Sequence, residues 1–270
     1  MYMRECESNN QEIIIYGDSK LSRRINEFSN CQTNKIDEYN FTQLYQKDEI
    51  NKDKKLTNTE TGIKNEKLAE TLLVGAVTCE WLGSQMAVVR PSAYDIDRQK
   101  VDLLAECAAY PSENYGEEPP VLAISIAINE HPKKEKNPDK LKTIPVKYFQ
   151  SPIYGTPSAL ESVIMVNVTI SRENANKLNK LLENIQQLIG NIHYNTQEQT
   201  QQLKEMMDKF ANHPTHLQIL KDISNQLEFF VKQASAETKK DDELTPRLKT
   251  LNDIIGIALA EKEQQLEDGQ

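Results

Sequence analysis

Residues 121–128 of the chain read VLAISIAI, a nearly unbroken apolar run. Only Ser125 interrupts it. Runs of this kind are typical of strands that are buried on both faces of a sheet. The segment from Val121 to Ile128 is therefore expected to lie inside the sheet of an α/β fold.

The residues before this strand predict one helix and two further strands. Apolar residues recur at helical spacing from Lys67 to Leu82, and Gly83 supplies a stop signal. The segments Met86 to Val89 and Val101 to Leu104 have the pattern of short strands, and Ser92 to Lys100 between them is turn-like. The apolar residues of the helix are Leu68, Leu72, Leu73, Ala76, Val77 and Trp81.

The residues after the buried strand continue the same pattern. Pro132 to Lys142 is rich in lysine and fits either a short helix or a loop. Val146 to Phe149 and Val163 to Ile170 are strand-like. We therefore expect residues 65–171 to form a compact α/β core in the order helix, three strands, connector and two strands.

Beyond this core, residues 172–270 change to the pattern of long helices. Three apolar stripes have spacings of three and four, and the charged run from Glu237 to Glu243 reads as a linker between the second and the third. These stripes must be buried against the α/β core, against one another or against a second subunit. They comprise Leu178, Leu181, Leu182, Ile185, Leu188, Ile189 and Ile192; Leu217, Leu220, Ile223, Leu227, Phe230, Val231 and Ala234; and Leu248, Leu251, Ile254, Ile255, Ala258 and Leu259.

Residues 1–64 differ from the rest in composition. They are rich in Asn, Lys, Glu, Ser and Thr, and their main apolar island is Ile13 to Tyr16. Such a segment buries too little apolar surface to offset the entropy that ordering costs. We expect a mostly disordered tail, with one added strand at the island as the alternative.

Composition also limits the location and the partners. The net charge of −9 disfavours nucleic-acid binding through a broad basic face. Met1 to Gln11 lacks the positive start and apolar run of a signal peptide, and no stretch reaches the ~18 apolar residues of a membrane span. The four cysteines have no CxxC spacing, which fits a reducing compartment. We expect a cytoplasmic protein without a membrane partner.

Three carboxylates are candidate metal ligands. Glu70 and Glu80 belong to the predicted helix and Asp102 to the second predicted strand. Carboxylates from a helix and an adjacent strand can converge on Mg²⁺, which prefers oxygen ligands. The alternative is that the glutamates face solvent and that Asp102 points to the wet face of the sheet.

Other polar clusters have simpler explanations. Asp95 and Asp97 fit a turn, where aspartate makes local backbone hydrogen bonds. His213 and His216 flank Pro214 at the expected start of a helix, so capping is favoured over metal binding.

The predicted connector carries the most basic stretch of this acidic chain. Its lysines could contact the phosphates of a nucleic acid, or they could belong to a solvated connector. They are Lys133, Lys134, Lys136, Lys140 and Lys142.

The order of a helix with Glu70, a hairpin, a strand with Asp102 and the buried strand resembles the core of the restriction-endonuclease-like, PD-(D/E)xK, nuclease superfamily. Residues 69–106, with 145–149 and 212–230, are also similar to a group of uncharacterised proteins of small-genome bacteria. The superfamily resemblance implies that Glu70 and Asp102 hold a metal ion.

The chain departs from the superfamily pattern on the next strand. In that superfamily this strand supplies an acidic residue and, two positions later, a lysine, whereas here the positions are occupied by Ser125, Ile126 and Ala127. The second metal ligand and the lysine that activates water are therefore missing. Lys142 or Lys147 would have to act as a displaced lysine.

Three functions remain open at this stage. The first is a degenerate nuclease-like domain that acts as a binding or interaction module without catalysis. The second is a nuclease that depends on Mg²⁺ or another divalent metal and uses a displaced lysine. The third is a structural assembly protein that forms a homodimer, or binds another protein, through its C-terminal helices.

Overall fold

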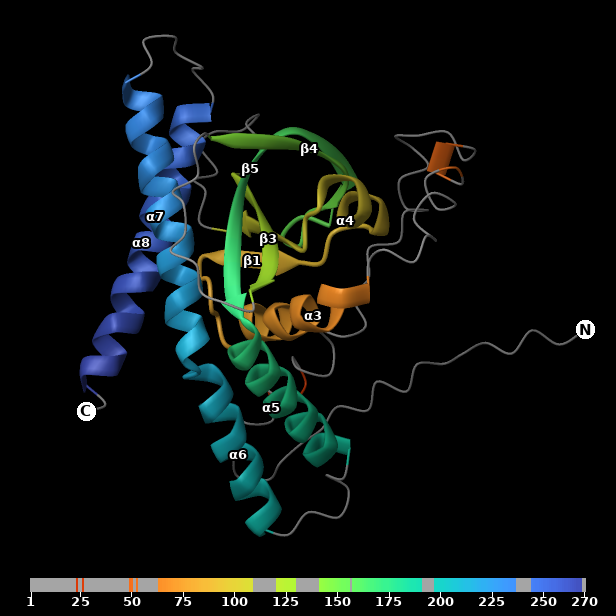
Figure 1. The fold of residues 1–270 in the computed structure, drawn as a ribbon, viewed down its shortest axis with the longest axis vertical. Helices are drawn as coiled ribbons and strands as arrows, with labels where there is room; N and C mark the ends of the chain where they lie inside the picture. Colours follow the sequence, from red (N-terminus) through yellow and green to blue (C-terminus); the bar gives the residue numbers. More distant parts are fainter. Residues whose placement is uncertain are drawn as a thin grey trace, which may run out of the picture.

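The structure, a computed structural model, describes most of the chain from the first predicted helix onward. Among the described residues, five strands form one mixed sheet in the order β1-β2-β3-β5-β4 (Figure 1). The strands are β1 Met86–Val89, β2 Leu103–Cys107, β3 Val121–Asn129, β4 Lys142–Gln150 and β5 Pro157–Ser171. The described residues are 63–108, 120–129, 141–155, 157–190, 197–236 and 244–268, with Arg23, Asn26, Glu49, Ile50 and Lys52.

Strand β3 lies at the centre of this sheet. It pairs antiparallel with β2 and parallel with β5, and β5 pairs antiparallel with β4. Leu122, Ile124 and Ile126 of β3 pack into one hydrophobic cluster, whereas Val121 and Ala123 pack into another. Because alternate residues of a strand face opposite sides, β3 is buried on both faces from Val121 to Ile124, as the apolar run predicted, whereas Ala127 near its end is exposed.

Six helices surround the sheet within the described residues. Helices α3, α4, α5 and α7 contact its strands, and α7 lies beside α8 along one flank of the molecule (Figure 1). The apolar stripes of residues 172–270 are therefore buried against the sheet and against one another. The helices are α3 Ile63–Thr78, α4 Ala93–Gln99, α5 Arg172–Gly190, α6 Gln197–Ala211, α7 Pro214–Ala236 and α8 Leu244–Asp268.

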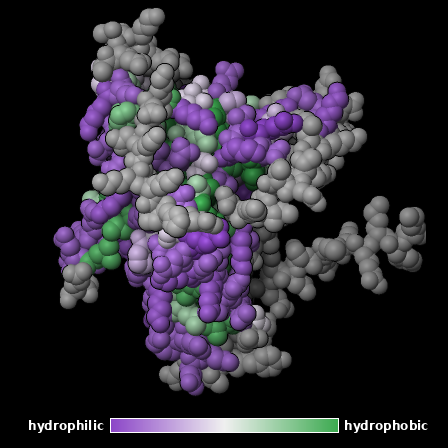
Figure 2. All heavy atoms as spheres, viewed as in Figure 1, coloured by the Kyte–Doolittle hydropathy of each residue, from purple (hydrophilic) through white to green (hydrophobic). Residues whose placement is uncertain are grey.

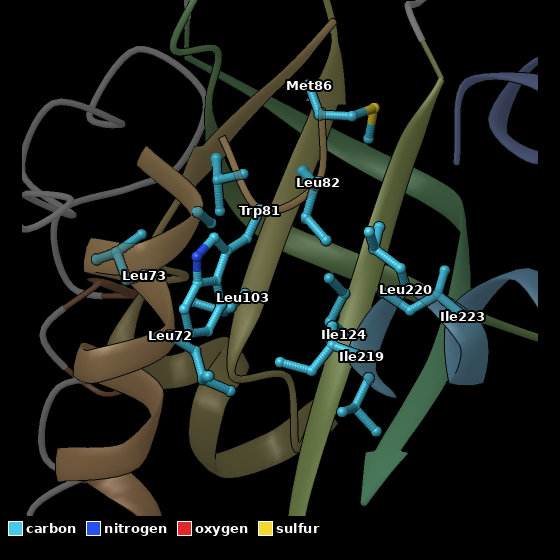
Figure 3. Close-up of a cluster of buried hydrophobic side chains, with 14 of the residues drawn as sticks. Leu72, Leu73, Trp81, Leu82, Met86, Leu103, Ile124, Ile219, Leu220 and Ile223 are labelled. Carbon is cyan, nitrogen blue, oxygen red and sulfur yellow. The ribbon is translucent and has the colours of Figure 1, made fainter. Parts of the chain in front are cut away.

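The largest core cluster joins the sheet to these helices. In Figure 3, Ile124 of β3 faces Ile219 and Leu220 of α7, and Trp81 lies against α3 beside Leu72. The opposite face of the sheet is filled mainly by side chains of β4 and β5 themselves. The mixed α/β fold with long C-terminal helices is therefore confirmed.

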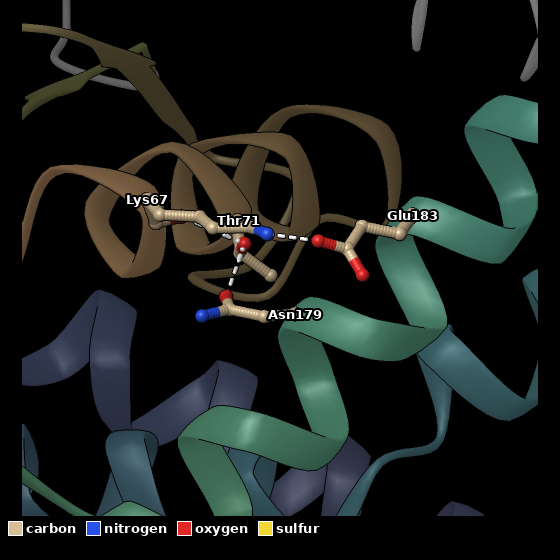
Figure 4. A network of polar contacts seen from close by, with 4 residues as sticks. All are labelled: Lys67, Thr71, Asn179 and Glu183. Atoms are coloured by element: carbon tan, nitrogen blue, oxygen red, sulfur yellow. Dashed lines mark hydrogen bonds and ion pairs between the residues drawn. The ribbon is translucent and has the colours of Figure 1, made fainter.

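Polar contacts fix α5 on α3 at the edge of this core (Figure 4). The Thr71 hydroxyl lies 2.7 Å from Asn179 Oδ1, and Lys67 forms an ion pair with Glu183. Hydrophilic side chains cover most of the visible surface of α5 and α6, with a strip of hydrophobic side chains between the two helices (Figure 2).

The structure corrects several predicted elements. The predicted turn from Ser92 to Lys100 contains helix α4, whose first turn is capped by Ser92 Oγ accepting from Asp95 N. Strand β2 begins at Leu103, after Asp102 rather than before it. Helix α6 was not predicted, although Leu203, Met207 and Phe210 bury one face of it.

Helix α3 ends at Thr78, four residues before the predicted end at Leu82. Glu80 has φ +52° and Gly83 has φ +88°, so the chain turns sharply here, and Gly83 N donates to Glu80 O at 2.7 Å. The turn folds Trp81 back over α3. The apolar spacing typical of a helix extends past Thr78 in the sequence because the turn also buries Trp81 and Leu82.

Some predictions fall outside the described residues. These are the strand at Ile13 to Tyr16, the linker Glu237 to Glu243 and nearly all of the connector Pro132 to Lys142. From the predicted tail the structure describes a helical piece at Glu49 and Ile50, and Ile50 is fully buried.

Candidate functional site

Asp102 lies at the junction between α4 and β2, beside the central strand. Its backbone N–H donates to Ile124 O at 2.9 Å, and its side-chain Oδ2 accepts from Ile126 N at 2.6 Å. Leu103 pairs with Ile124, so continuing the antiparallel register places Asp102 opposite Ser125. The carboxylate thus takes the place of a backbone carbonyl where β2 begins, and it continues the ladder along β3.

Burial controls the protonation of Asp102. The side chain is half-buried, and burial raises its pKa, while the Ile126 N–H and the positive charge of Arg90 lower it to a smaller extent. Oδ1 makes no hydrogen bond with any described residue. One oxygen of Asp102 is therefore committed to the sheet, and the other could bind a ligand.

The other two predicted metal ligands do not complete a site with Asp102. Glu70 lies half-buried on α3, and Glu80 lies exposed in the turn after α3. In the part of the chain that the structure describes, no group of three or more His, Cys, Asp or Glu side chains could hold a metal ion. The three carboxylates are thus not brought together, and metal binding by Glu70 and Asp102 alone remains a prediction.

Ser125 replaces the acidic residue expected from the superfamily resemblance. It is half-buried on β3. Its partner on β5, the strand that flanks β3 opposite to β2, is Asn167. A hydroxyl is a neutral ligand, so this position provides no second negative charge beside Asp102.

Lys147, one of the two candidate displaced lysines, is held within the fold. Its Nζ lies 2.6 Å from Glu49 Oε1, and it sits 5.2 Å and 5.4 Å from the ring centroids of Tyr94 and Tyr148. These contacts hold the ammonium group in an ion pair and over two aromatic rings, whose faces attract a cation.

The remaining lysines of the predicted phosphate-binding cluster are less well placed by the structure. Lys142 is exposed at the start of β4. Lys133, Lys134, Lys136 and Lys140 lie outside the described residues.

Asp95 is a buried structural residue, although the sequence pattern assigned it to a turn. Its Oδ1 accepts from Lys147 N at 2.9 Å, and its Oδ2 accepts from Tyr148 N at 3.1 Å and from Ser92 Oγ at 2.7 Å. The local bond expected of a turn aspartate is present, but the carboxylate also joins α4 to β4. The pairing of β4 with β5 is irregular between Val146 and Phe149, and Asp95 binds the two backbone N–H groups within that irregularity.

The sequence contained a signal for the start of α4 at Ser92 and Asp95. Ser92 and Asp95 stand three positions apart, and this spacing of serine and an acidic residue is typical of a capping box at the start of a helix. Burial raises the pKa of Asp95, because the hydrogen bonds from Lys147, Ser92 and Tyr148 offset the desolvation only in part.

Glu106 is a second buried carboxylate, and the sequence pattern did not identify it. It lies on β2, and the Ser151 hydroxyl donates to it, 2.8 Å from Oε2. Ser151 Oγ in turn accepts from Ile153 N and Tyr154 N, which shapes the turn after β4. Burial raises the pKa of Glu106. Its flanking residues, Ala105 and Cys107, gave no sequence signal beyond an apolar strand.

The two histidines near Pro214 have different roles. Pro214 begins α7, and Thr215 N donates to His213 Nδ1 at 3.3 Å, which confirms the capping role for His213. His216 is instead buried, with Nε2 3.0 Å from Trp81 O and its ring stacked on that of Trp81 at 5.2 Å. Burial and the charge of Lys262 lower the pKa of His216 to about 4.

Lys262 is a buried cation on α8 that sequence reasoning missed. Its Nζ lies 2.8 Å from Asn212 Oδ1 and 3.5 Å from Ala211 O, at the carboxyl end of α6. The negative end of a helix dipole stabilises a cation there. Burial lowers the pKa of Lys262, and its contacts identify it as a helix cap rather than a catalytic amine.

None of the described helices combines the length and the apolar character needed to cross a lipid bilayer. Comparison with known proteins gives no match to a family model, and no curated protein or solved structure is significantly similar to the chain.

Proposed function

We propose that the α/β core is a nuclease-like scaffold that acts as a binding or interaction module without catalysis. The observation that carries this proposal is the 2.6 Å hydrogen bond from Ile126 N to Asp102 Oδ2. A carboxylate used in this way holds the strand geometry, and its role does not require a metal ion. The resemblance to the PD-(D/E)xK superfamily then concerns the scaffold, with Glu70 and Asp102 as remnants of a metal site.

The residue opposite Asp102 and the contacts of one candidate displaced lysine support the same proposal. Ser125, opposite Asp102, contributes no charge, and the Lys147 ammonium is paired with Glu49. Removing a single electrostatic group from an active site typically costs about 3 kcal/mol of transition-state stabilisation. Among the described residues, Asp102 faces an uncharged Ser125 and Lys147 is held in an ion pair, an arrangement better suited to recognition than to bond cleavage.

For the partner we propose another protein chain, in the cytoplasm, bound through the outer surfaces of the C-terminal helices. The exposed apolar residues of α8, Ile257 and Leu266, are nine positions apart and so lie on opposite sides of the helix. Contact through α8 would therefore use mixed polar and apolar surfaces. Nucleic acid at the exposed Lys142 is the alternative partner.

Calorimetric titration of Mg²⁺ and Mn²⁺ into the wild type and Asp102→Ala tests the proposal, with a nuclease assay on the same samples. We expect no saturable metal binding and no cleavage in either protein, and a lower free energy of unfolding for Asp102→Ala because Ile126 N loses its acceptor. Asp97→Ala, on the nearby surface of α4, is the matched control and should unfold like the wild type. Metal binding and cleavage that are present in the wild type and lost only in Asp102→Ala would establish the enzyme instead.

A further inference from the structure

A small aromatic site on α4 and β4 receives residues from far upstream in the chain. We call Tyr94, Lys147 and Tyr148 the socket, and Glu49 with Ile50 the clasp. The clasp residues precede α3, and the socket residues follow it. The contact therefore closes a long loop in the chain.

Among the described residues, the apolar part of the contact is the side chain of Ile50 against the two tyrosines. Ile50 and Tyr148 are both fully buried, and Tyr94 packs against them. The rings of Tyr94 and Tyr148 meet edge to face, with centroids 5.7 Å apart. This cluster is separate from the two larger clusters that fill the faces of the sheet. The clasp thus adds to the fold without being part of its main core.

The polar part of the contact that the structure describes is an ion pair at the rim. Glu49 Oε1 lies 2.6 Å from Lys147 Nζ, while the same ammonium group lies over both tyrosine rings. The Glu49 side chain is 48% exposed and that of Lys147 is 19% exposed, so water reaches the pair. The socket therefore recognises a negative charge next to a branched apolar side chain.

The socket is held in shape from behind by other residues. Asp95 accepts from the backbone N–H groups of Lys147 and Tyr148, and it is itself bonded to Ser92. None of these bonds involves the clasp. The socket is thus preorganised, and losing Ile50 from it would not remove the bonds that shape it.

We propose that this contact is exchangeable, so that the socket of one copy of the chain accepts Glu49 and Ile50 from a second copy. The socket meets the same two side chains whichever copy supplies them, and exchange of an identical element is a low-cost route to a dimer. Within one chain the contact between the clasp and the socket is intramolecular, which gives it the advantage of effective concentration over the same contact between two copies. The closed single chain therefore dominates at low protein concentration, and exchanged dimers form as the concentration rises.

This inference goes beyond the proposed function and does not depend on it. It involves neither Asp102 nor the C-terminal helices, so a metal-binding result would leave it unchanged. It assigns a homotypic interaction surface to the α4–β4 edge of the core.

A charge exchange between two variants tests it. Glu49→Lys places two cations together within one chain, and Lys147→Glu places two anions together, so each variant disfavours its own closed contact. In a dimer of the two variants, each chain places its clasp in the socket of the other. Both contacts then join opposite charges. Sedimentation of the mixture should give a heterodimer with a dissociation constant at least about tenfold lower than that of the wild-type dimer, since close charge pairs across interfaces couple by more than ~1.4 kcal/mol.

Three controls make the result decisive. The double variant Glu49→Lys/Lys147→Glu restores the pair within one chain and should sediment as the wild type does, which also checks that the substitutions are compatible with folding. Adding Ile50→Asp to the Glu49→Lys chain should abolish the heterodimer. Mixing Glu49→Lys with Lys177→Glu, on the distant surface of α5, should give none. A mixture that remains monomeric while the double variant is folded would overturn the proposal, and so would a heterodimer that survives Ile50→Asp.

Discussion

Gly75 of α3 lies directly against the indole ring of Trp81, so that a Cβ atom on Gly75 would come within 2.8 Å of ring atom Cδ2. The ring has no room to retreat, because it is stacked on Phe210 and on His216 at centroid distances of 5.2 Å. The missing side chain at position 75 is thus what allows the turn after α3 to fold back onto the helix.

Gly75→Ala should lower the free energy of unfolding by about 1–2 kcal/mol, because overpacking outweighs the gain in helix propensity. Gly256→Ala is the matched control, since Gly256 is also inside a helix and an added methyl group there would meet no atom within 4 Å beyond its own helix and chain neighbours. That variant should gain about 0.5–1 kcal/mol. Urea unfolding measures both, and equal stability of the two variants would contradict the close packing described for Trp81.

Glu80→Gly should raise the free energy of unfolding by about 0.5–1 kcal/mol, because Glu80 has φ +52° and glycine adopts this conformation without steric cost. Glu80 is also one of the predicted metal ligands, so Mn²⁺ titration of the same variant separates the two roles. We expect unchanged titration and a higher melting temperature. A variant that is less stable and also loses metal binding would restore Glu80 as a ligand.

Asp95→Ala should cost about 3 kcal/mol of stability, because it leaves the buried N–H groups of Lys147 and Tyr148 without their acceptor. Asp95→Asn keeps one acceptor oxygen and should cost roughly half as much. Asp97→Ala on the same helix removes only a partly exposed ion pair with Lys100 and should stay within about 0.5 kcal/mol of the wild type. Chemical unfolding of the three variants side by side checks this order of stability losses. If Asp95 were only a turn residue, Asp95→Ala would cost little more than Asp97→Ala.

His216 should make the protein less stable as the pH falls from 6.5 towards 4. Burial and Lys262 lower its folded-state pKa to about 4, whereas the unfolded chain titrates near 6.5. Between these values the unfolded chain binds a proton that the folded chain does not, so acid favours unfolding, by about 2.5 kcal/mol at pH 4.5.

The variant His216→Gln removes this titration and keeps an N–H donor for the Trp81 carbonyl. Its stability at neutral pH should be lower because the ring stacking is lost, but its stability should vary less between pH 7 and pH 4.5 than that of the wild type. Urea unfolding at both pH values gives the comparison. Parallel pH dependence in the two proteins would mean that His216 is protonated in the folded state as readily as in the unfolded chain.

The elements that could be predicted are those with a long apolar period. Strand β3 and helices α5, α7 and α8 each carry enough regularly spaced apolar residues to fix both their type and their buried face. Helix α4 could not be found in this way, because it has seven residues and a composition of Ser, Asp and Lys around it that equally fits a turn.

The candidate site depends on geometry that the sequence pattern does not contain. Asp102 was expected within the second strand, but β2 begins at Leu103, two residues later than expected, so Asp102 precedes the strand and its carboxylate accepts from Ile126 N. The burial of Lys262 depends on where α6 ends, and α6 itself was not predicted. Such contacts join elements that are distant in the chain, so they cannot be predicted from the local spacing of apolar residues.

The position of β5 between β3 and β4 governs the order in which the protein can assemble during synthesis. When residues up to 155 have left the ribosome, β3 still lacks its neighbour on one side and β4 has no partner strand, because both wait for Pro157–Ser171. An unpaired edge on the most apolar strand is a template for association with other chains. A nascent chain stalled before β5 would therefore expose an apolar strand edge to other chains, and a ribosome-bound chaperone that covers this edge would protect the chain until β5 has emerged.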